Sequence, residues 1–363
     1  MKRFIVTGII LLFICMSITP SFAFDIVKKS STLVSNGNTL YVGGSGEGNY
    51  TRIQDAIDNA SGGYTIFVYA GTYFEFITIE KTITLIGEDQ NLTIIDIDHL
   101  YPQPQGGIVI HVINAPNVTI DSFCFRNHFS YNITGGIWAE NCPGLKISNI
   151  SDSWHHAVDF GFRLRFCSES TITQTFIKYK TDSAIDIQDS FNVTILENYI
   201  LGTGGYTPYS CGISLIDCEN ILISNNTITK CTLYGIFLLN SDKNTLVRND
   251  IQDNIAFGLY LLGSNNNFIS NNELSFNHVK GIFINTSKQN TISKNNIYDN
   301  GEKYIFFSNA FFNTWNQNFW GDGSSKRQLI VGLVQLERFN LSFPILKVDW
   351  HPAQEPYEIP MGV

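Results

Sequence analysis

The segment between residues 111 and 188 gathers side chains that could bind or process a sugar. Imidazole, indole, guanidinium, carboxylate and amide groups are supplied by His111, Trp138, Glu140, His156, Asp159, Arg163, Arg165, Asp182, Asp186 and Gln188. An aromatic platform beside polar groups suits a sugar ring. We therefore assign substrate binding to one half of this set, namely His111, Trp138, Glu140, Asp182 and Gln188.

The other five residues suggest abstraction of the proton next to a uronate carboxylate, as in a polysaccharide lyase or epimerase. Arg163 and Arg165 would neutralise the carboxylate, and His156 would act as the base. Asp159 would orient His156, while Asp186 would supply an acid or bind a divalent cation such as calcium. No other cofactor and no metal-ligand set is indicated.

Two other interpretations remain open. A glycoside hydrolase needs two carboxylates flanking one bond, with Glu140, Asp159, Asp182 and Asp186 as candidates. Alternatively, Arg163 and Asp186 form an ordinary cross-strand ion pair on a polar surface. The protein would then be a non-catalytic structural or adhesive solenoid of the cell envelope.

A repeat of short strands must position these side chains. Four segments of similar sequence begin at Gly212, Gly235, Gly258 and Gly281, each 23 residues after the last. A period of this size indicates one supersecondary unit per repeat, stacked on its neighbours. Apolar and polar residues alternate within each unit, which is typical of strands. The sequence therefore predicts an all-β solenoid with about nine regular coils between residues 109 and 320.

The same register places residues of one kind above each other in columns. One inward apolar column contains Ile172, Ile195, Ile223, Leu246, Ile269, Ile292 and Trp315, and a second contains Ile177, Ile200, Ile228, Ile251, Leu274, Ile297 and Trp320. A ladder of stacked amides contains Asn198, Asn226, Asn249, Asn272, Asn295 and Asn318. Cysteine, serine and alanine share a column of small residues, so we interpret its cysteines as buried thiols first, with a disulfide as the lesser option.

The register also places the candidate site on one outward face. His111, Trp138, Arg163 and Asp186 occupy the same position in successive coils. Because neighbouring coils lie about 4.8 Å apart, Arg163 is expected between Trp138 and Asp186. Further along this column the residues become large and apolar.

Several stretches of the sequence resemble known β-helix families. The sequence Ile53-Gln-Asp-Ala-Ile-Asp-Asn-Ala and the segment Ile83-Thr-Leu-Ile-Gly-Glu88 resemble the start of the pectin-lyase-like superfamily. The Gly-Ile-x-Leu and Ile-Ser-Asn-Asn-x-Ile units resemble NosD-type repeats, and the tail at Asn318-Phe-Trp-Gly resembles archaeal surface proteins of that type. The resemblance implies a single-stranded right-handed parallel β-helix. It places the asparagine ladder between the second and third strands, and any active site on the outer face of the first strand.

The ends of the chain suggest export and capping. Lys2 and Arg3, an apolar run and Ser21-Phe22-Ala23 predict a signal peptide over residues 1–23, and hence a secreted or cell-surface location. We expect a lead-in over 24–48 and a β-helix over 49–320 that begins with a capping helix. Residues 321–363 are expected to form an irregular capping tail that folds back and covers the apolar part of the outward column. The alternative is that this apolar patch stays open as a platform for sugar rings or a partner protein, and would then be the binding site.

Composition narrows the partners. The formal net charge of -9, with no long basic cluster, argues against a nucleic-acid partner. No methionine-rich or histidine-rich tract is present, so copper handling is not expected. The expected partner is a polysaccharide or a cell-envelope glycan, bound by a monomer.

Overall fold

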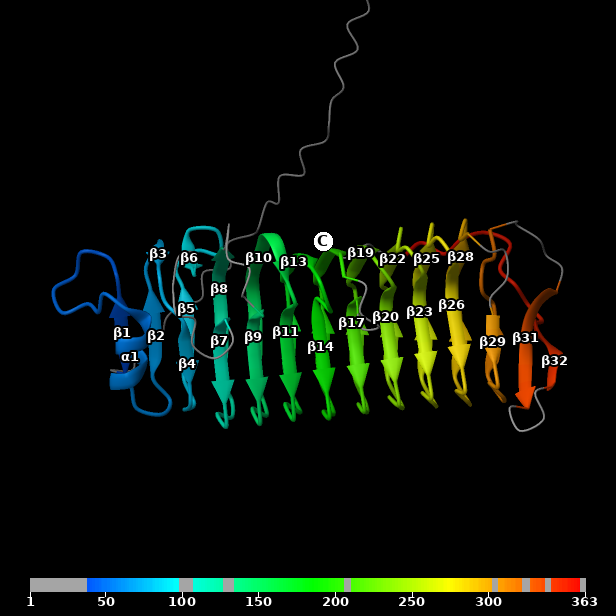
Figure 1. Cartoon of the computed structure of the whole chain (residues 1–363), viewed down its shortest axis with the longest axis horizontal. Coiled ribbons are helices and arrows are strands. Elements are labelled where there is room, and N and C mark those ends of the chain that lie inside the picture. Colours follow the sequence, from blue (N-terminus) through cyan, green and yellow to red (C-terminus); the bar gives the residue numbers. More distant parts are fainter. Residues whose placement is uncertain are drawn as a thin grey trace, which may run out of the picture. The chain divides into compact units, whose positions relative to one another are not determined.

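The computed structural model describes residues 38–97, 107–126, 134–205, 210–301, 306–321, 327–336 and 341–359, with all of their side chains except those of 153–157, 306 and 336. These residues form a parallel β-helix in which successive coils stack side by side (Figure 1). A typical coil consists of β17 (Cys211–Ile216), β18 (Leu222–Ser224) and β19 (Thr227–Cys231). No helix within these residues is long and apolar enough to cross a membrane.

The first strands of the coils form a 12-stranded sheet, here called sheet B, and the second and third strands form a 20-stranded sheet, here called sheet A. Besides β17, sheet B contains β4 (Ile77–Ile79), β7 (Ile108–Ile113), β9 (Gly135–Glu140), β11 (Phe160–Arg165), β14 (Ile185–Gln188), β20 (Tyr234–Leu239), β23 (Phe257–Leu262), β26 (Lys280–Asn285), β29 (Phe306–Ser308), β31 (Gln328–Leu336) and β32 (Leu341–Asp349).

Sheet A contains both remaining strands of each coil. Its second strands are β2 (Thr65–Val68), β5 (Thr84–Gly87), β12 (Thr171–Thr173), β15 (Thr194–Leu196), β18, β21 (Thr245–Val247), β24 (Phe268–Ser270), β27 (Thr291–Ser293) and β30 (Thr314–Asn316). Its third strands are β3 (Gly71–Tyr73), β6 (Thr93–Asp96), β13 (Phe176–Lys180), β16 (Tyr199–Thr203), β19, β22 (Asp250–Gln252), β25 (Glu273–Ser275) and β28 (Asn296–Tyr298). The long strands β8 (Thr119–Arg126) and β10 (Lys146–Val158) occupy both positions, and β1 (Thr39–Val42) pairs with β2.

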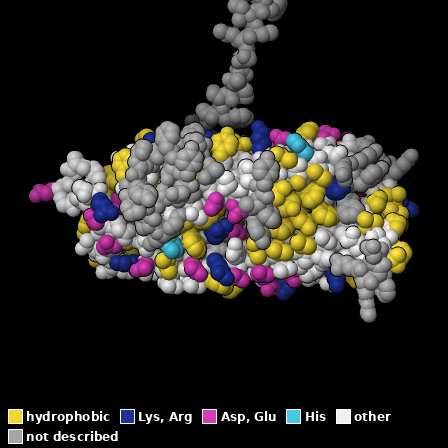
Figure 2. All heavy atoms as spheres, viewed as in Figure 1, with side chains coloured by type: hydrophobic (Ala, Val, Ile, Leu, Met, Phe, Trp, Pro, Cys, Tyr) yellow, Lys and Arg dark blue, Asp and Glu magenta, His cyan; other side chains and the backbone are white. Residues whose placement is uncertain are grey.

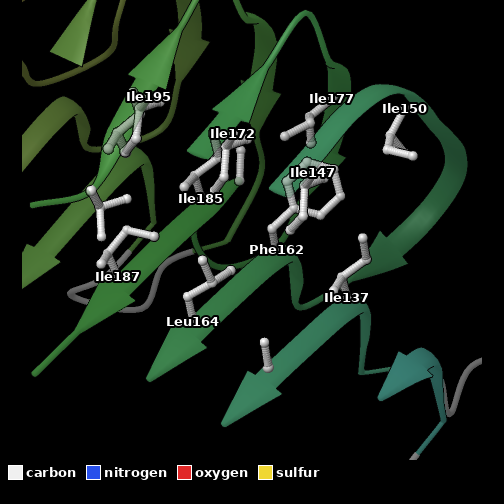
Figure 3. Close-up of a cluster of buried hydrophobic side chains, with 14 of the residues drawn as sticks. Ile137, Ile147, Ile150, Phe162, Leu164, Ile172, Ile177, Ile185, Ile187 and Ile195 are labelled. Carbon is white, nitrogen blue, oxygen red and sulfur yellow. The ribbon is translucent and has the colours of Figure 1, made fainter. Parts of the chain in front are cut away.

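The predicted apolar columns fill the interior. Ile172, Ile195 and Ile223 pair in register on neighbouring strands and are completely buried, and the column continues to Trp315. Ile177 and Ile200 pair in the same way in the second column. Figure 3 shows Ile172, Ile177 and Ile195 near side chains of the first strands, such as Phe162 and Ile185, inside the coils. The sequence prediction of the core is confirmed, because a period of two in each strand puts every second side chain inside.

The repeated glycine leaves room for that core. A Cβ atom on Gly212 would lie 2.3 Å from Cγ2 of Ile228 and 2.6 Å from the carbonyl oxygen of Gly235. Any larger residue would push the first strand away from the third strand of its own coil and from the next coil. The glycine column is therefore a packing requirement.

The asparagine ladder is also confirmed, and it lies between the second and third strands as expected. Nδ2 of Asn226 donates to Oδ1 of Asn249 at 3.0 Å, and Nδ2 of Asn249 donates to Oδ1 of Asn272 at 2.9 Å. Two further ladders were not predicted. They contain Asn244, Asn267, Asn290 and Asn313 in one turn and Asn254, Asn277 and Asn300 in another.

All six described cysteines are free thiols and are buried. Cys142, Cys167 and Cys218 lie in the predicted column of small residues, whose other members include Ser190 and Ser241. Burial raises the pKa of Cys218 to about 12, so this thiol stays protonated at neutral pH.

The predicted N-terminal helix is α1 (Ile53–Asn59), which buries Ile53, Ala56 and Ile57. Glu75 occupies its N-terminus: the two carboxylate oxygens accept hydrogen bonds from the backbone N–H groups of Ile53 at 2.7 Å and Gln54 at 2.9 Å. This contact satisfies donors that have no partner within the helix.

The prediction of an irregular tail is wrong for β31 and β32, which are regular strands, whereas residues 350–359 contain no helix or strand. β31 pairs in parallel with β29 and adds another rung to sheet B, and β32 pairs with β31 in antiparallel fashion. These two strands, whose apolar residues have no place in the repeat, extend the sheet, because an added strand supplies backbone hydrogen bonds to the open edge of the last coil. Tyr357 then contacts Asn296 and Gln317 on sheet A. The described residues after β32 therefore return along the side of sheet A, and not along the outer face of sheet B.

Candidate functional site

The predicted outward column exists on sheet B. His111 pairs with Trp138, Trp138 with Arg163, and Arg163 with Asp186, each on the neighbouring strand. The column continues through Ser214 and the aromatic residues of β20, β23 and β26. Polar and aromatic side chains therefore share one face because the repeat keeps its register.

Arg163 is the centre of the polar part. Its Nε donates to Oδ2 of Asp186 at 2.8 Å, and its Nη2 donates to Oδ2 of Asp182 at 3.1 Å. Its guanidinium carbon lies 4.2 Å from the ring centroid of Phe160, a cation–π contact. Gln188 donates to the same oxygen of Asp186 at 2.9 Å. These contacts bring Asp182, Asp186 and Gln188 together around one cation.

Asp186 is the most enclosed member of this cluster, with 4% of its surface exposed. Its Oδ1 and the hydroxyl of Ser214, on the next strand, are both buried and have no hydrogen-bond partner among the described residues. A buried carboxylate needs a close cation, so the contact with Arg163 has a structural role as well as any functional one.

Arg165 lies at the rim. Its Nε donates to Oδ2 of Asp189 at 3.1 Å, and its guanidinium carbon lies 4.8 Å from the ring centroid of Phe166. Glu140 pairs with Arg165 in the register of the strands. Both predicted arginines are thus bound to carboxylates of the protein itself.

His111 and Trp138 form a stacked pair, with ring centroids 5.1 Å apart and planes inclined by 26°. Burial lowers the pKa of His111, and the nearby Glu140 and Glu80 oppose this effect. Both rings are partly exposed. The pair is an aromatic surface next to the cluster around Arg163.

The predicted base is not placed by the structure. His156 lies in β10, but its side chain is outside the described residues. Asp159 is exposed and accepts a hydrogen bond from the hydroxyl of Thr181 at 3.1 Å. Whether Asp159 orients His156 therefore stays a prediction.

Beyond Ser214 the outer face becomes aromatic. The centroids of Tyr260 and Phe283 are 4.9 Å apart at 15°, and those of Tyr234 and Phe257 are 5.6 Å apart at 6°. Phe237 lies against Tyr234 and Tyr260 and is almost completely buried. Figure 2 shows the hydrophobic side chains gathered over β20, β23 and β26, with the charged cluster over β11 and β14 of the same face. We call Tyr234, Phe237, Phe257, Tyr260 and Phe283 the aromatic platform.

Tyr234 and Phe257 were missed by the sequence analysis, as was Phe160. Each directly precedes the glycine, or the equivalent Gly161, that starts the repeat unit. An aromatic residue just before that glycine is the signal that could have found them. The side chains of Tyr234 and Phe257 join the aromatic platform from the strand position just before the glycine.

A shallow depression of about 440 Å³ lies elsewhere, at the turn that follows the first strands. Asp189, Asp217 and Glu219 line it together with Phe191 and neighbouring polar residues. Among the residues that the structure describes, no three histidine, cysteine, aspartate or glutamate side chains are placed to hold a metal ion.

A family model for a right-handed β-helix region matches residues 206–321. Over these residues the chain is similar to a right-handed β-helix, in agreement with the parallel coils described above. No curated protein matches its sequence. The β-helix is similar in fold to several solved structures, each of low sequence identity.

Three of these structures cover most of the β-helix. A mutant of DFA-IIIase from Arthrobacter chlorophenolicus A6, in complex with DFA-III, matches with a TM-score of 0.59 and 13% identity, over 89% of this chain and 87% of that one. The Dettilon tailspike protein matches with a TM-score of 0.60 and 14% identity, over 78% of this chain and 62% of that one. PfbA, a surface adhesin of Streptococcus pneumoniae, matches with a TM-score of 0.54 and 13% identity, over 84% of this chain and 95% of that one. At such identities the similarity establishes the fold.

Proposed function

We propose that this β-helix is exported and binds a polysaccharide along the outer face of sheet B. The observation that carries the proposal is the aromatic platform, whose rings stack on an outer sheet face that would ordinarily be polar. Partly exposed tyrosine and phenylalanine rings provide flat apolar surface for the faces of sugar rings. Because the aromatic platform and the polar cluster around Arg163 lie in register on sheet B, we treat the two as parts of one binding face.

The length of that face suits a polymer. Five rungs separate Trp138 from Tyr260 in the register of sheet B. At a spacing of about 4.8 Å per rung, the two aromatic surfaces lie about 24 Å apart. A single sugar cannot reach both surfaces, whereas an extended oligosaccharide can. The ligand is therefore proposed to be a chain that runs along the solenoid axis.

The charges favour a neutral glycan over a uronate. Arg163 is shared between Asp182 and Asp186, and Arg165 is bound to Asp189. Each arginine that could neutralise a substrate carboxylate is thus already compensated by the protein, and a further anion would be repelled. This geometry supports binding more than the lyase or epimerase chemistry considered above, which needs free cations beside the carboxylate.

Similarity of fold supports the same class of ligand. One structural neighbour was solved in complex with DFA-III, and another is a surface adhesin. The proposal takes from them a carbohydrate-related role at the cell surface. Catalysis by Asp182 and Asp186 as a pair of acid and base is not favoured, because one guanidinium group binds both carboxylates.

A glycan array probed with the purified protein tests the proposal. We expect binding to neutral linear oligosaccharides, with longer chains bound more tightly, and weaker binding to polyuronates. Preferential binding to polyuronates would overturn the charge argument. Absence of binding to any glycan would leave the structural or adhesive solenoid as the better account.

A further inference from the structure

Asp152 breaks the inward apolar column of the β-helix. It pairs in register with Phe125 on one side and with Ile177 on the other, so it occupies a position that the neighbouring coils fill with apolar side chains. Lys180 reaches it from the next coil, with Nζ 2.7 Å from Oδ1 of Asp152. Both side chains are completely buried.

The surroundings of the pair are tight. Cβ atoms placed on Gly136 and Gly161, which begin the repeat units of β9 and β11, would lie 3.0 and 3.4 Å from Oδ2 of Asp152. That oxygen has no hydrogen-bond partner among the described residues. The two charged groups are thus held in contact beneath the strands that carry Trp138 and Arg163, in a space without access for solvent.

An ion pair is a costly way to fill this space. Removal of two charges from water is repaid only by excellent geometry and further hydrogen bonds, and well-packed apolar residues are often at least as stable. Burial raises the pKa of Asp152 to about 6 and lowers the pKa of Lys180, with each partner opposing the shift of the other. Both effects of burial favour the neutral carboxylic acid and the neutral amine, which are the reactive forms of the two groups.

We propose that Lys180 and Asp152 condense to an intramolecular amide bond that cross-links adjacent coils. Nζ of Lys180 attacks Cγ of Asp152, the N–C bond forms, and one C–O bond of the carboxyl group breaks. The amine gives up a proton to the departing hydroxyl, so one water molecule leaves and the balance needs no oxidant, reductant or other reactant. The fold supplies proximity and exclusion of water, which can correspond to effective concentrations of about 10⁵ M or more.

Peptide mapping of the purified, denatured protein tests this modification directly. The expected result is a branched tryptic peptide that joins the segment containing Asp152 to the segment containing Lys180, lighter than the sum of the two by one water. Trypsin should fail to cleave after Lys180. Recovery of both peptides unlinked would overturn the proposal. Cooperative unfolding of a sample of the same protein serves as the control that it was folded before denaturation.

Variants supply the matched controls. Lys180→Arg keeps the charge but should give the unmodified mass, whereas Lys178→Arg on the same strand should keep the loss of one water. Asp152→Asn should lose one ammonia instead, because the Cγ–Nδ2 bond then breaks and the NH2 group leaves with a proton from the amine. If a variant at either position fails to fold, the peptide map of the wild-type protein still decides the question, since it needs no substitution.

Discussion

Asp349 closes the asparagine ladder at Asn318. Oδ2 of Asp349 accepts hydrogen bonds from the backbone N–H of Asn318 at 2.9 Å and from its Nδ2 at 3.1 Å. Oδ1 accepts the backbone N–H of Gln317 at 3.0 Å, and the indole of Trp320 donates to Oδ2 at 3.2 Å. In every earlier rung the next asparagine supplies this accepting oxygen. The carboxylate thus replaces the missing seventh asparagine at the end of the solenoid.

Replacement of Asp349 by alanine should destabilise the last coils. The loss of several hydrogen bonds to one buried carboxylate leaves buried donors unsatisfied, and we expect the free energy of unfolding to fall by about 3 kcal/mol. Asp349→Asn keeps an accepting oxygen and should lose less. Urea unfolding measures both variants, and equal stability of Asp349→Ala and the wild type would show that the ladder needs no terminal acceptor.

Removal of the Arg163 side chain should also reduce stability, because Asp186 is buried and would lose its cation. We expect Arg163→Ala to cost about 3 kcal/mol in the free energy of unfolding. Arg165→Ala is the matched control: its pair with Asp189 is exposed, and the change should stay within about 0.5 kcal/mol. Similar losses for the two variants would mean that burial does not distinguish these pairs.

Asp250 should make the stability depend on pH. Burial, and secondly the charge of Glu273, raises its pKa from 3.8 to about 6, while Gln252 opposes the shift with a hydrogen bond. Between these two values the folded state holds more protons than the unfolded state, so stability should fall as pH rises from about 4 to about 6 and then level off.

Asp250→Asn removes this dependence. At pH 7 the variant should be more stable than the wild type by up to about 3 kcal/mol, and at pH 3.5 the two should be similar. Asp253→Asn, at a more exposed carboxylate, serves as the control. Thermal unfolding across this pH range checks the sign, and a variant less stable than the wild type at pH 7 would show that Asp250 is not penalised by burial.

The sequence predicted the regular part of the fold well because the repeat is nearly one-dimensional. Once Gly212 and Gly235 set the period of 23 residues, the pairing of Ile223 with Leu246 followed from counting residues. The pairing of Asp186 with Ser214 also required extra residues to be placed in the turn before Gly212. The outward column could be predicted in the same way. Each coil contacts only its neighbours, so a local register determines the contacts.

The remaining features depend on contacts outside the repeat. Asp349 reaches Asn318 across a hairpin that has no counterpart in the other coils, so no period could have revealed it. The partner of Arg163 was predicted as Asp186, but the second contact to Asp182 depends on the path of a turn. Asp152 could have been noticed, because it interrupts an apolar column between Phe125 and Ile177.

The most direct test of glycan binding is calorimetric titration of the best array ligand into the wild type, Tyr260→Ala and Phe312→Ala. Tyr260 is part of the aromatic platform, whereas Phe312 is an exposed ring that lies just before β30 of sheet A. Loss of one stacking ring should weaken binding about tenfold, or about 1.4 kcal/mol, in Tyr260→Ala. Phe312→Ala should bind as the wild type does. Unchanged affinity of Tyr260→Ala, with equal stability of all three proteins, would contradict the proposed binding face.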